Sequence, residues 1–482
     1  MRNLLSTTII YTILSFLQGF VSLLLQPVYT TYLSSSHYAV FSMMNNLSNL
    51  VAIIAALSIG NTFFTFYYDY QTDRAKLEAF LGQLLSFSIL VSAVVAVFLF
   101  FVGDVLFRQM FRDTAFQFYP YGCWAVLSGA VYTLIVPYIV LLRNDKNVAA
   151  YAWFIITWVF ATVVGQVVGI VYATDAINGA LLGRLVGNTI GAAIVLWHCR
   201  RWLTWRLDTT YLAKPLRFAA FLLPGFLLEW GGASGDRFWV ERWLSLSLLG
   251  VYSLLNVISA TTEMASGALR MAIMPFLYES LGSNTPQSTE QRQHLYNFYT
   301  AIMVLAVTAV VFLVSHINYF IKNPDYLTLQ PYVYLYVLGY LFSAISAFII
   351  FVFFYHKNPK PNLYLMLGVI SLNIALNYCL TPTYALWGVV AAATGARGVA
   401  LAMLIGFNPR LFAPFLRWHS AILLLSTVLF LVLAHFATYK QYCSHNIAGW
   451  AMLLGVIVLL LGIYGQQMKQ VVMATRALLG NK

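Results

Sequence analysis

Charged residues are scarce in this sequence. Only 9% of its 482 residues are Asp, Glu, Lys or Arg, whereas a soluble domain is typically about one quarter charged. Hydrophobic residues make up 61% of the chain, and the mean hydropathy is +0.78. So few charges cannot cover the surface of a water-soluble protein of this length. The composition therefore excludes a soluble fold and indicates a membrane protein.

Cysteines and metal-binding patterns are also few. The four cysteines are far apart in the sequence, and the eight histidines show no metal-ligand spacing. Cys443 and His445 lie close together, but two such residues alone do not make a metal site. We therefore expect no metal and no cofactor.

The motifs of common enzyme classes are missing. There is no Walker lysine motif, and the stretch GASGD at 232–236 does not fit the G-x-S-x-G nucleophile elbow. The longest hydrophilic connection, about 279–294, is short and falls on the predicted cytoplasmic side. A membrane glycosyltransferase, polymerase or ligase usually presents a large outer loop that carries its catalytic groups. We therefore expect that the protein is not an enzyme and has no catalytic residues.

The sequence does contain long apolar runs. Fourteen of them are long enough to cross a bilayer as a helix, which takes about 20 residues. Because the runs are continuous rather than alternating, they favour helices over a β-barrel. The first run is too long for a signal peptide and lacks a small-residue cleavage site, so we interpret it as a retained helix. The expected spans are 5–33, 39–66, 79–102, 118–142, 148–173, 176–199, 216–243, 249–275, 295–319, 328–355, 361–380, 383–405, 411–434 and 447–467.

Lys and Arg residues are distributed unevenly between the predicted loops. With the N-terminus in the cytoplasm, 18 of them fall on the cytoplasmic side and 5 on the outer side. This bias predicts that both termini lie in the cytoplasm. The net charge of +12 then reflects topology and anionic headgroups, and no basic soluble domain is present to bind nucleic acid. Of the cysteines, only Cys379 and Cys443 fall near the outer face, where one disulfide between them is an open alternative.

One segment of the sequence occurs twice. AVFSMMNNLS at 39–48 and GVYSLLNVIS at 250–259 share Val, Ser, Asn and Ser in register. The same shift of 211 residues places the first predicted helix on the seventh. A second pair, INGALLGRLVGN from Ile177 and LWGVVAAATGAR from Leu386, keeps its small residues in phase. Chance similarity of apolar segments is the alternative, and the joint alignment of both pairs favours a true repeat.

The repeat predicts two lobes of six helices with the same topology. An even number of crossings separates the lobes, so they are parallel repeats related by an axis along the membrane normal. Transporters with this arrangement bind substrate between the lobes and work by alternating access. We expect an N-terminal lobe at 1–199, a cytoplasmic linker at 200–214, a C-terminal lobe at 215–410 and two additional helices at 411–482.

Several of these segments resemble a known family. The Asp236-Arg237 pair at a helix end, followed by a short turn and a Gly-Val-Tyr-Ser start, resembles the second-lobe signature of polysaccharide-biosynthesis flippases. The segments QPVYTTYLSSSHYAVFS and ALWGVVAAATGARG also match, although Ala39 stands where the family more often has Gly. The resemblance covers most of the chain to about residue 405. It is to the O-antigen (Wzx-type) branch of the multidrug/oligosaccharidyl-lipid/polysaccharide exporter (MOP) superfamily. It implies a MATE-like all-α fold and the transfer of an undecaprenyl-diphosphate-linked oligosaccharide to the outer leaflet.

Charged residues well inside the predicted spans are the candidate functional residues. An Arg or Asp near the bilayer centre costs about 2.5–3.5 kcal/mol on insertion scales, and such residues usually face a wet cavity. A guanidinium matches phosphate oxygens bidentately and keeps its charge when desolvated. We therefore predict a cavity that binds the diphosphate and glycan through arginines. The candidates are Arg184 and Arg397, which lie deepest, followed by Arg270 and Arg237.

Two of these arginines have a structural alternative. Arg270 lies near a helix end, where its side chain can reach the interface, and Glu263 stands seven residues away on the same helical face. Arg237 has Glu241 one turn further along. Ion pairs of this kind would hold the helices rather than bind substrate.

The seventh predicted helix is unusual. Pro224 precedes a cluster of glycines that is interrupted by Glu229 and Asp236. Proline and clustered glycine weaken a helix, so we expect this one to be bent or discontinuous, as the helices at transporter binding sites are. Glu229 and Asp236 are seven residues apart and are expected to share a face. Together with Glu263 they are candidates for gating or for carrying a coupling proton or cation. The alternative is that Asp236 and Arg237 stabilise the turn to the next helix.

Other transporters of the same superfamily are the main functional alternatives. Multidrug exporters have twelve helices and typically an acidic site in the first lobe, whereas Arg184 is the only deep charge of that lobe here. A lipid II flippase also has fourteen helices, but its first two typically carry several arginines, which this chain lacks between Arg2 and Arg74. Both departures favour O-antigen or another surface polysaccharide. We interpret aromatic clusters such as FYYDY at 66–70 and YVYLYVLGY at 332–340 mainly as interfacial belts.

Overall fold

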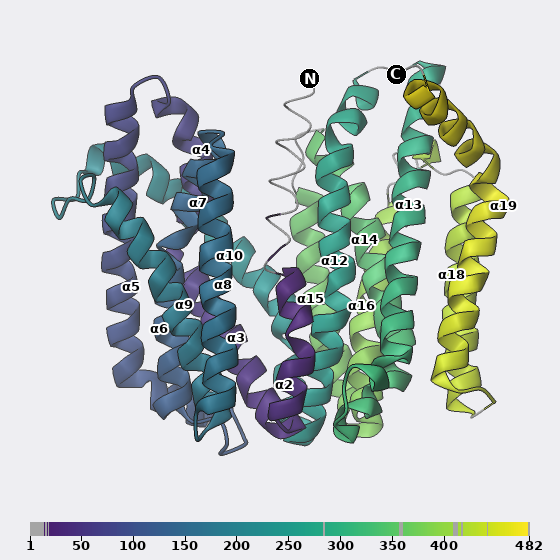
Figure 1. Ribbon diagram of the computed structural model, residues 1–482, viewed down its shortest axis with the longest axis horizontal. Coiled ribbons are helices and arrows are strands. Elements are labelled where there is room, and N and C mark those ends of the chain that lie inside the picture. Colours follow the sequence, from purple (N-terminus) through teal and green to yellow (C-terminus); the bar gives the residue numbers. More distant parts are fainter. Residues whose placement is uncertain are drawn as a thin grey trace. The chain divides into compact units, whose positions relative to one another are not determined.

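The chain folds as a bundle of helices joined by short turns, seen in a computed structural model (Figure 1). No β-strand occurs among the residues that the structure describes. Their backbone covers residues 14, 17, 19–282, 285–355, 360–407, 413–415, 418–440 and 442–480. Side chains are described at the same positions except 354, 360, 361, 407, 414, 439 and 464–480.

The chain divides into two units, Met1–Leu254 and Leu255–Lys482, and the division falls inside one long helix, α12. The first unit contains α2 (Gln26–Tyr32), α3 (Ser35–Ala56), α4 (Ile59–Tyr70), α5 (Arg74–Met110), η1 (Phe118–Gly122), α6 (Cys123–Tyr132), α7 (Ile135–Asn144), α8 (Val148–Tyr172), α9 (Ala176–Cys199), α10 (Thr209–Ser234), α11 (Asp236–Trp243) and the start of α12 (Leu246–Leu281). The second unit contains the rest of α12, α13 (Pro286–Ser315), η2 (Ile317–Tyr319), η3 (Pro324–Tyr332), α14 (Val333–Tyr355), α15 (Lys360–Tyr384), α16 (Leu386–Phe407), η4 (Ala413–Phe415), α18 (Trp418–Tyr439) and α19 (His445–Gly480).

Thirteen helical segments of the described chain are long and apolar enough to cross a membrane. They correspond to the second through fourteenth expected spans, and the first expected span, 5–33, lies partly outside the described residues. The prediction of an all-α, multi-pass membrane protein is confirmed. The side of the membrane on which each loop lies stays a prediction. Five cations of the predicted cytoplasmic set lie outside the described residues, namely Arg2, Lys357, Arg410, Arg417 and Lys482.

The span expected at 39–66 is interrupted in the structure. Leu57 and Ser58 adopt left-handed backbone conformations, with φ of 43° and 60°, and they divide the span into α3 and α4. Left-handed conformations are uncommon for residues with a side chain and do not continue a right-handed helix. Periodicity did not predict this break because both residues are compatible with an apolar helix in sequence.

Glycines bring α8 and α9 together into a close hairpin. A Cβ atom added to Gly179 of α9 would lie 2.0 Å from the carbonyl oxygen of Gly169 on α8, so no side chain fits there. The second unit contains a corresponding hairpin, formed by α15 and α16. There a Cβ atom added to Gly388 would lie 2.3 Å from the carbonyl oxygen of Leu380. Gly388 is the residue that the repeated segments align with Gly179, so aligned glycines lie against the preceding helix in both hairpins.

The segment between α9 and α10 is attached to α5. The side-chain amide of Gln83 donates to the carbonyl oxygen of Arg206 at 3.0 Å, and its oxygen accepts from the N–H of Asp208 at 3.0 Å. Asp208 then caps α10 by accepting from the N–H of Thr210 at 2.8 Å, which lowers the pKa of the Asp208 carboxyl. α10 thus begins at Thr209, earlier than the span expected at 216–243. The residue limits of the lobes and of the linker stay predictions.

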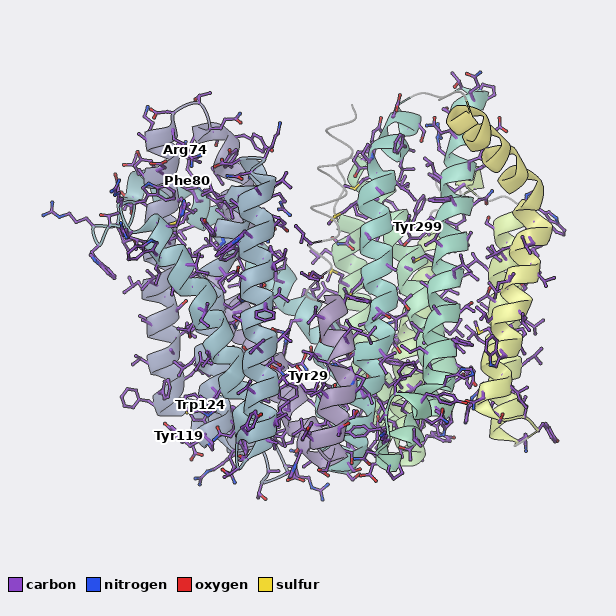
Figure 2. All side chains as sticks on the ribbon, viewed as in Figure 1. Tyr29, Arg74, Phe80, Tyr119, Trp124 and Tyr299 are labelled. Carbon is purple, nitrogen blue, oxygen red and sulfur yellow. The ribbon has the colours of Figure 1, made fainter. Side chains whose placement is uncertain are left out.

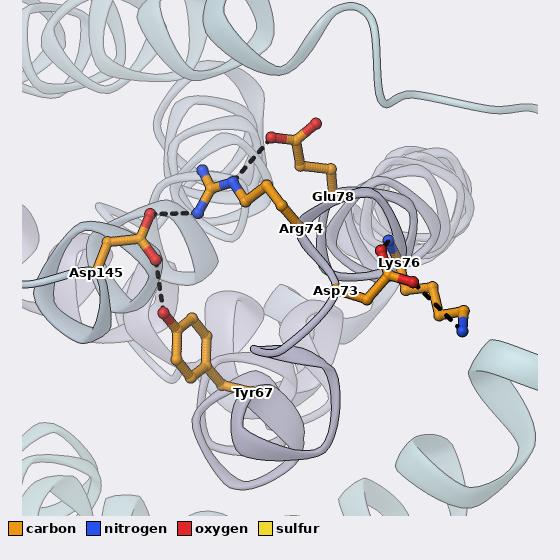
Figure 3. A network of polar contacts seen from close by, with 6 residues as sticks. All are labelled: Tyr67, Asp73, Arg74, Lys76, Glu78 and Asp145. Atoms are coloured by element: carbon orange, nitrogen blue, oxygen red, sulfur yellow. Dashed lines mark hydrogen bonds and ion pairs between the residues drawn. The ribbon is translucent and has the colours of Figure 1, made fainter.

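A polar network joins two turns of the first unit (Figure 3). Asp145, between α7 and α8, accepts from the hydroxyl of Tyr67 at 2.6 Å and pairs with Arg74 at 2.7 Å. Arg74 also pairs with Glu78 one turn along α5, at 2.9 Å. Because Tyr67 is buried, the interpretation of the cluster at 66–70 as an interfacial belt is wrong for this residue. The network fastens the α4–α5 turn to the α7–α8 turn, on the side predicted to be cytoplasmic.

The two additional helices, α18 and α19, belong to the second unit. They pack on each other and on α13. At one end of this contact, the indole ring of Trp450 on α19 lies 4.8 Å from the ring of Phe312 and 5.7 Å from that of His316. Aromatic packing of this kind holds the additional helices against the repeated part of the chain.

Candidate functional site

Arg184 lies on α9 and faces α3. Its Nη1 donates to Oδ1 of Asn45, and its Nη2 donates to Oδ1 of Asn49 at 3.1 Å. Asn45 and Asn49 are one turn apart, so one face of α3 presents two amide oxygens to the guanidinium. Both partners are neutral. Within the described part of the chain, Arg184 forms no ion pair with a carboxylate.

Polar side chains from other helices of the first unit complete this surrounding. The phenol groups of Tyr29 on α2 and Tyr132 on α6 lie in the neighbourhood of Arg184. Tyr29, which is labelled in Figure 2, is buried, and its hydroxyl donates to Oε1 of Gln166 on α8 at 2.5 Å. Arg184 itself is half-buried, and Asn49 is exposed. Neutral dipoles therefore stabilise the cation, and part of its surface stays exposed in the described structure.

Arg397 has aromatic neighbours in the second unit. Its guanidinium carbon lies 4.5 Å from the centre of the Tyr340 ring and 5.8 Å from that of Tyr336, both on α14. Gly339 leaves room for the guanidinium, since a Cβ atom there would lie 3.2 Å from Nη1 of Arg397. Nδ2 of Asn256 on α12 donates to the Tyr336 hydroxyl at 2.6 Å and to the Tyr340 hydroxyl at 3.4 Å. Arg397 thus makes cation–π contacts with two tyrosines whose hydroxyl groups both accept from the Asn256 amide.

Tyr334, Tyr336 and Tyr340 are buried, at 0%, 0% and 7% exposure. The interpretation of the cluster at 332–340 as an interfacial belt is therefore wrong for these residues. Alternating runs of Tyr and apolar residues look alike in sequence whether the helix faces headgroups or other helices. Only the packing of α14 against α13 and α16 distinguishes the two cases.

The sequence repeat relates the surroundings of the two arginines. Asn45 and Asn256 occupy the same position of the repeated segment, 211 residues apart, and each lies beside one of the arginines or its aromatic partners. The arginines themselves are not equivalent, because the second pair of repeated segments aligns Arg397 with Asn188. Sequence reasoning selected the arginines and missed both asparagines. The Asn that recurs in the repeat was the signal that pointed to them.

Arg270 forms the ion pair that its spacing allows. Its Nη2 lies 3.2 Å from Oε1 of Glu263, seven residues earlier on α12. Its guanidinium carbon also lies 5.7 Å from the centre of the Phe351 ring. Nη1 of Arg270 is buried and has no hydrogen-bond partner among the described residues. The structural alternative, an ion pair within one helix, is therefore what Arg270 and Glu263 form, and their opposite charges largely compensate each other.

Asp236 and Arg237 begin α11 and are both buried, at 4% exposure. Asp236 accepts a hydrogen bond from the Tyr252 hydroxyl of α12 at 2.9 Å, and Nη1 of Arg237 donates to the carbonyl oxygen of Ala233 at 3.4 Å. These contacts hold the break between α10 and α11 and the turn to α12, as the structural alternative for this pair predicts.

Glu241 has different partners from those expected. The alternative in which Glu241 pairs with Arg237 is wrong. Oε1 of Glu241 instead accepts from the backbone N–H groups of Arg112 and Asp113, at 2.6 and 2.8 Å. α11 packs against the loop that follows α5, so the Glu241 carboxylate meets backbone donors of that loop rather than Arg237 on its own helix.

Glu229 and Asp236 differ in burial. Glu229 is exposed on α10, whereas Asp236 is buried on α11. The expected discontinuity is limited to Gly235, which keeps right-handed helical angles (φ −61°, ψ −33°) and donates its N–H to the carbonyl oxygen of Gly231 at 2.8 Å. The shared face of the two carboxylates stays a prediction.

The cysteines and potential metal ligands add no further site. All four thiols are free, so the alternative of a disulfide between Cys379 and Cys443 is wrong. No group of three or more His, Cys, Asp or Glu side chains that could hold a metal ion occurs in the described ranges.

Solved structures share the fold of this chain. No protein-family model and no curated protein sequence matches it. The structure of the lipid II flippase MurJ in an inward closed conformation superposes with a TM-score of 0.70 at 15% identity, over 95% of this chain and 100% of that chain. An inward-facing multidrug resistance MATE family transporter of the MOP superfamily superposes with a TM-score of 0.62 at 14% identity, over 84% and 98%.

A third structure is the MOP superfamily transporter from Pyrococcus furiosus, described as having a binding pocket whose reverse polarity suggests a different function. It gives a TM-score of 0.50 at 13% identity, over 85% of this chain and 96% of that chain. At these identities the likeness concerns the fold alone. The chain has the all-helical, multi-pass membrane fold of MOP-superfamily flippases and transporters.

Proposed function

We propose that this protein is a flippase that moves an undecaprenyl-diphosphate-linked oligosaccharide across the bacterial inner membrane by alternating access, for O-antigen or another surface polysaccharide. The observation that carries the proposal is the surrounding of Arg184. Its guanidinium is held by the neutral amides of Asn45 and Asn49, and no carboxylate in the described chain pairs with it.

The contrast with Arg270 supports this reading. A cation retained for structural reasons inside a membrane is expected to pair with an opposite charge, as Arg270 does with Glu263. Arg184 has dipoles only, which leaves its charge available to a ligand. The bonds from the guanidinium to the amide oxygens are already charge-assisted, and a diphosphate oxygen adds the attraction between opposite charges. A diphosphate oxygen therefore competes well with the amide oxygens.

Arg397 suits a second part of the same substrate. Arg397 is half-buried, whereas Tyr336, Tyr340 and Asn256 beside it are buried. Of this group, the guanidinium is therefore the part that can meet a substrate. We assign Arg397 to binding of the glycan or its phosphate, and its aromatic neighbours to holding the guanidinium in place. Arg237, Glu229 and Asp236 are assigned to gating around the α10–α11 break, and Arg270 and Glu263 to an ion pair within α12.

A lipid II flippase is the second candidate, because the superposition with MurJ covers almost the whole chain. Both substrates carry a prenyl diphosphate, so the Arg184 site fits either. A multidrug exporter is less well supported, because no Asp or Glu between residues 14 and 199 is buried in the described chain. The Pyrococcus furiosus transporter supports the use of site polarity, rather than fold, to infer the substrate.

The test is deletion of the gene in its native host, followed by complementation at matched expression. We would measure surface glycan and lipid-linked repeat units in cells that carry the wild type, Arg184→Gln, Arg184→Lys or Arg397→Ala. Lys keeps the charge of Arg184 and loses its planar fork. The matched control is Arg108→Gln, which removes an arginine that is 79% exposed and pairs with Asp104 on α5.

The proposal predicts that deletion removes the surface glycan and leaves lipid-linked repeat units on the cytoplasmic face. Wild type and Arg108→Gln are expected to restore export, Arg184→Gln to fail and Arg184→Lys to restore it in part. Unchanged glycan with reduced drug efflux would replace the flippase by an exporter. Accumulation of lipid II would select the second candidate. Full rescue by every Arg184 and Arg397 variant would contradict the site assignment alone.

A further inference from the structure

Two adjacent asparagines on α3 face different helices of the first unit. Asn45 contacts Arg184 on α9, whereas Asn46 contacts α10. Oδ1 of Asn46 accepts from the Ser234 hydroxyl at 3.0 Å, and its backbone carbonyl oxygen accepts from Nε1 of Trp230 at 3.1 Å. α3 is thus connected on one side to the candidate anion site and on the other to the end of α10.

Few side chains of α10 are buried by the described residues. The buried residues of α10 are Leu212, Pro215 and Ala219 near its start and Ser234 at its end. Between them lies Pro224, and a Cβ atom added to Gly225 would meet no atom within 4 Å. The helix is therefore anchored at its two ends, and Asn46 supplies hydrogen bonds at the second anchor, next to the break before α11.

Hydrogen bonding fixes the side chain of Asn46. Its Nδ2 donates to the carbonyl oxygen of Ser42, one turn earlier on α3, at 2.8 Å. With Nδ2 bound there, Oδ1 points toward Ser234 and cannot turn away without losing a bond. A displacement of α3 is therefore transmitted to the end of α10 rather than absorbed by rotation of the side chain.

We propose that Asn46 is a positioning residue that couples occupation of the Arg184 site to the position of α10. The inference rests on the proposed function. An anion that binds Arg184 takes the guanidinium away from the oxygens of Asn45 and Asn49, because an anionic oxygen attracts the cation more strongly than a neutral amide oxygen does. Loss of those contacts frees α3 to move relative to α9. Asn46 is on the same helix, so it carries the end of α10 with it.

The test measures binding and movement separately in the full-length protein. A spin label is attached at Gly225→Cys, where the side chain has open space, with Cys379 and Cys443 replaced by Ser. Farnesyl diphosphate serves as the soluble prenyl-diphosphate probe. Its affinity is measured by equilibrium binding, and the response of α10 is read from the label spectrum.

The variants are chosen to separate coupling through Asn46, called the relay below, from binding at Arg184. Asn46→Val copies the repeat, which has Val257 at the equivalent position, and Trp230→Phe removes the second hydrogen bond. Arg184→Gln removes the site. Thr189→Ala is the matched control, because the exposed Thr189 hydroxyl bonds only to its own helix, at the carbonyl oxygen of Leu185.

In the wild type and in Thr189→Ala, we expect the probe to bind and to change the label spectrum. Asn46→Val with Trp230→Phe is expected to bind within about twofold of wild type and to lose the spectral response, each single variant losing part of it. A full response in the double variant would overturn the inference. So would a loss of affinity of about tenfold or more, about 1.4 kcal/mol, because Asn46 would then belong to the binding site itself.

The two proposals fail in different ways. If wild type does not bind farnesyl diphosphate, or if Arg184→Gln binds it equally well, the proposed site is wrong and the relay falls with it. If binding depends on Arg184 and the label responds identically in every Asn46 and Trp230 variant, the proposed site stands and only the relay is wrong.

Discussion

Replacement of Glu241 tests how α11 is attached to the rest of the first unit. The carboxylate is 4% exposed, and its Oε1 accepts from two consecutive backbone N–H groups, those of Arg112 and Asp113. Oε2 is buried and has no hydrogen-bond partner among the described residues. The charged groups around the carboxylate include Arg112, whose Nη1 donates to the carbonyl oxygen of Arg242 at 3.2 Å.

The structure sets the expected magnitudes. Glu241→Ala leaves two backbone donors without an acceptor, at about 1–3 kcal/mol for each buried group. Water can reach a loop at a helix end, so we expect a total loss of about 2–4 kcal/mol. Glu241→Gln keeps a neutral acceptor and removes a buried charge, while charge-assisted bonds are roughly twice as strong as neutral ones. These effects oppose each other, and we expect a loss of about 1 kcal/mol.

The free energy of unfolding is to be measured by titration with sodium dodecyl sulfate in mixed micelles. The matched control is Asp104→Asn, which removes a partly exposed carboxylate paired with Arg108 on α5 and is expected to cost less than about 1 kcal/mol. The reasoning would be refuted if Glu241→Ala were no less stable than this control. It would also be refuted if Gln destabilised the protein more than Ala.

Three further predictions follow from the packing. Gly179→Ala is expected to destabilise the protein by about 1–3 kcal/mol in the same titration, because its Cβ would meet the Gly169 backbone. Gly231→Ala, where no described atom lies near the added Cβ, is expected to stabilise it by about 0.5–1 kcal/mol. Equal effects of the two substitutions would contradict the hairpin contact. Tyr67→Phe removes one bond of the network in Figure 3 and is expected to cost about 0.5–1.5 kcal/mol of unfolding free energy, measured against Tyr68→Phe as the exposed control. Cys379 is expected to react with a maleimide to the same extent with and without reductant, because the thiol is free and exposed; labelling that required reductant would show a disulfide.

Much of the fold was predictable from the order of apolar residues. The span that became α8 was expected at 148–173 and is found at Val148–Tyr172, and the one that became α9 agrees at both ends. A membrane span is a local property, since each run must be long enough to cross the hydrocarbon and must satisfy its own backbone hydrogen bonds. The interruption at Leu57 and Ser58 was not predictable, because it depends on backbone conformations that the surrounding helices impose.

The candidate site was likewise predictable from the sequence only in part. The sequence by itself identified Arg184 as a cation deep in a span, and the repeat carried Asn45 without showing what it contacts. Helical spacing also determined the Arg270–Glu263 pair, because both residues lie on one helix whose geometry brings them together.

Only the tertiary structure decided which partner each remaining charge takes. The same spacing argument failed for Arg237 and Glu241, since the loop after α5 supplies Glu241 with backbone donors that lie far away in sequence. The tertiary structure likewise brings the asparagines of α3 to Arg184 and places no carboxylate of the described chain beside that cation. Periodicity states which side chains are within reach along one helix. The choice among competing partners depends on groups that other helices bring close, and that choice exists only once the chain has folded.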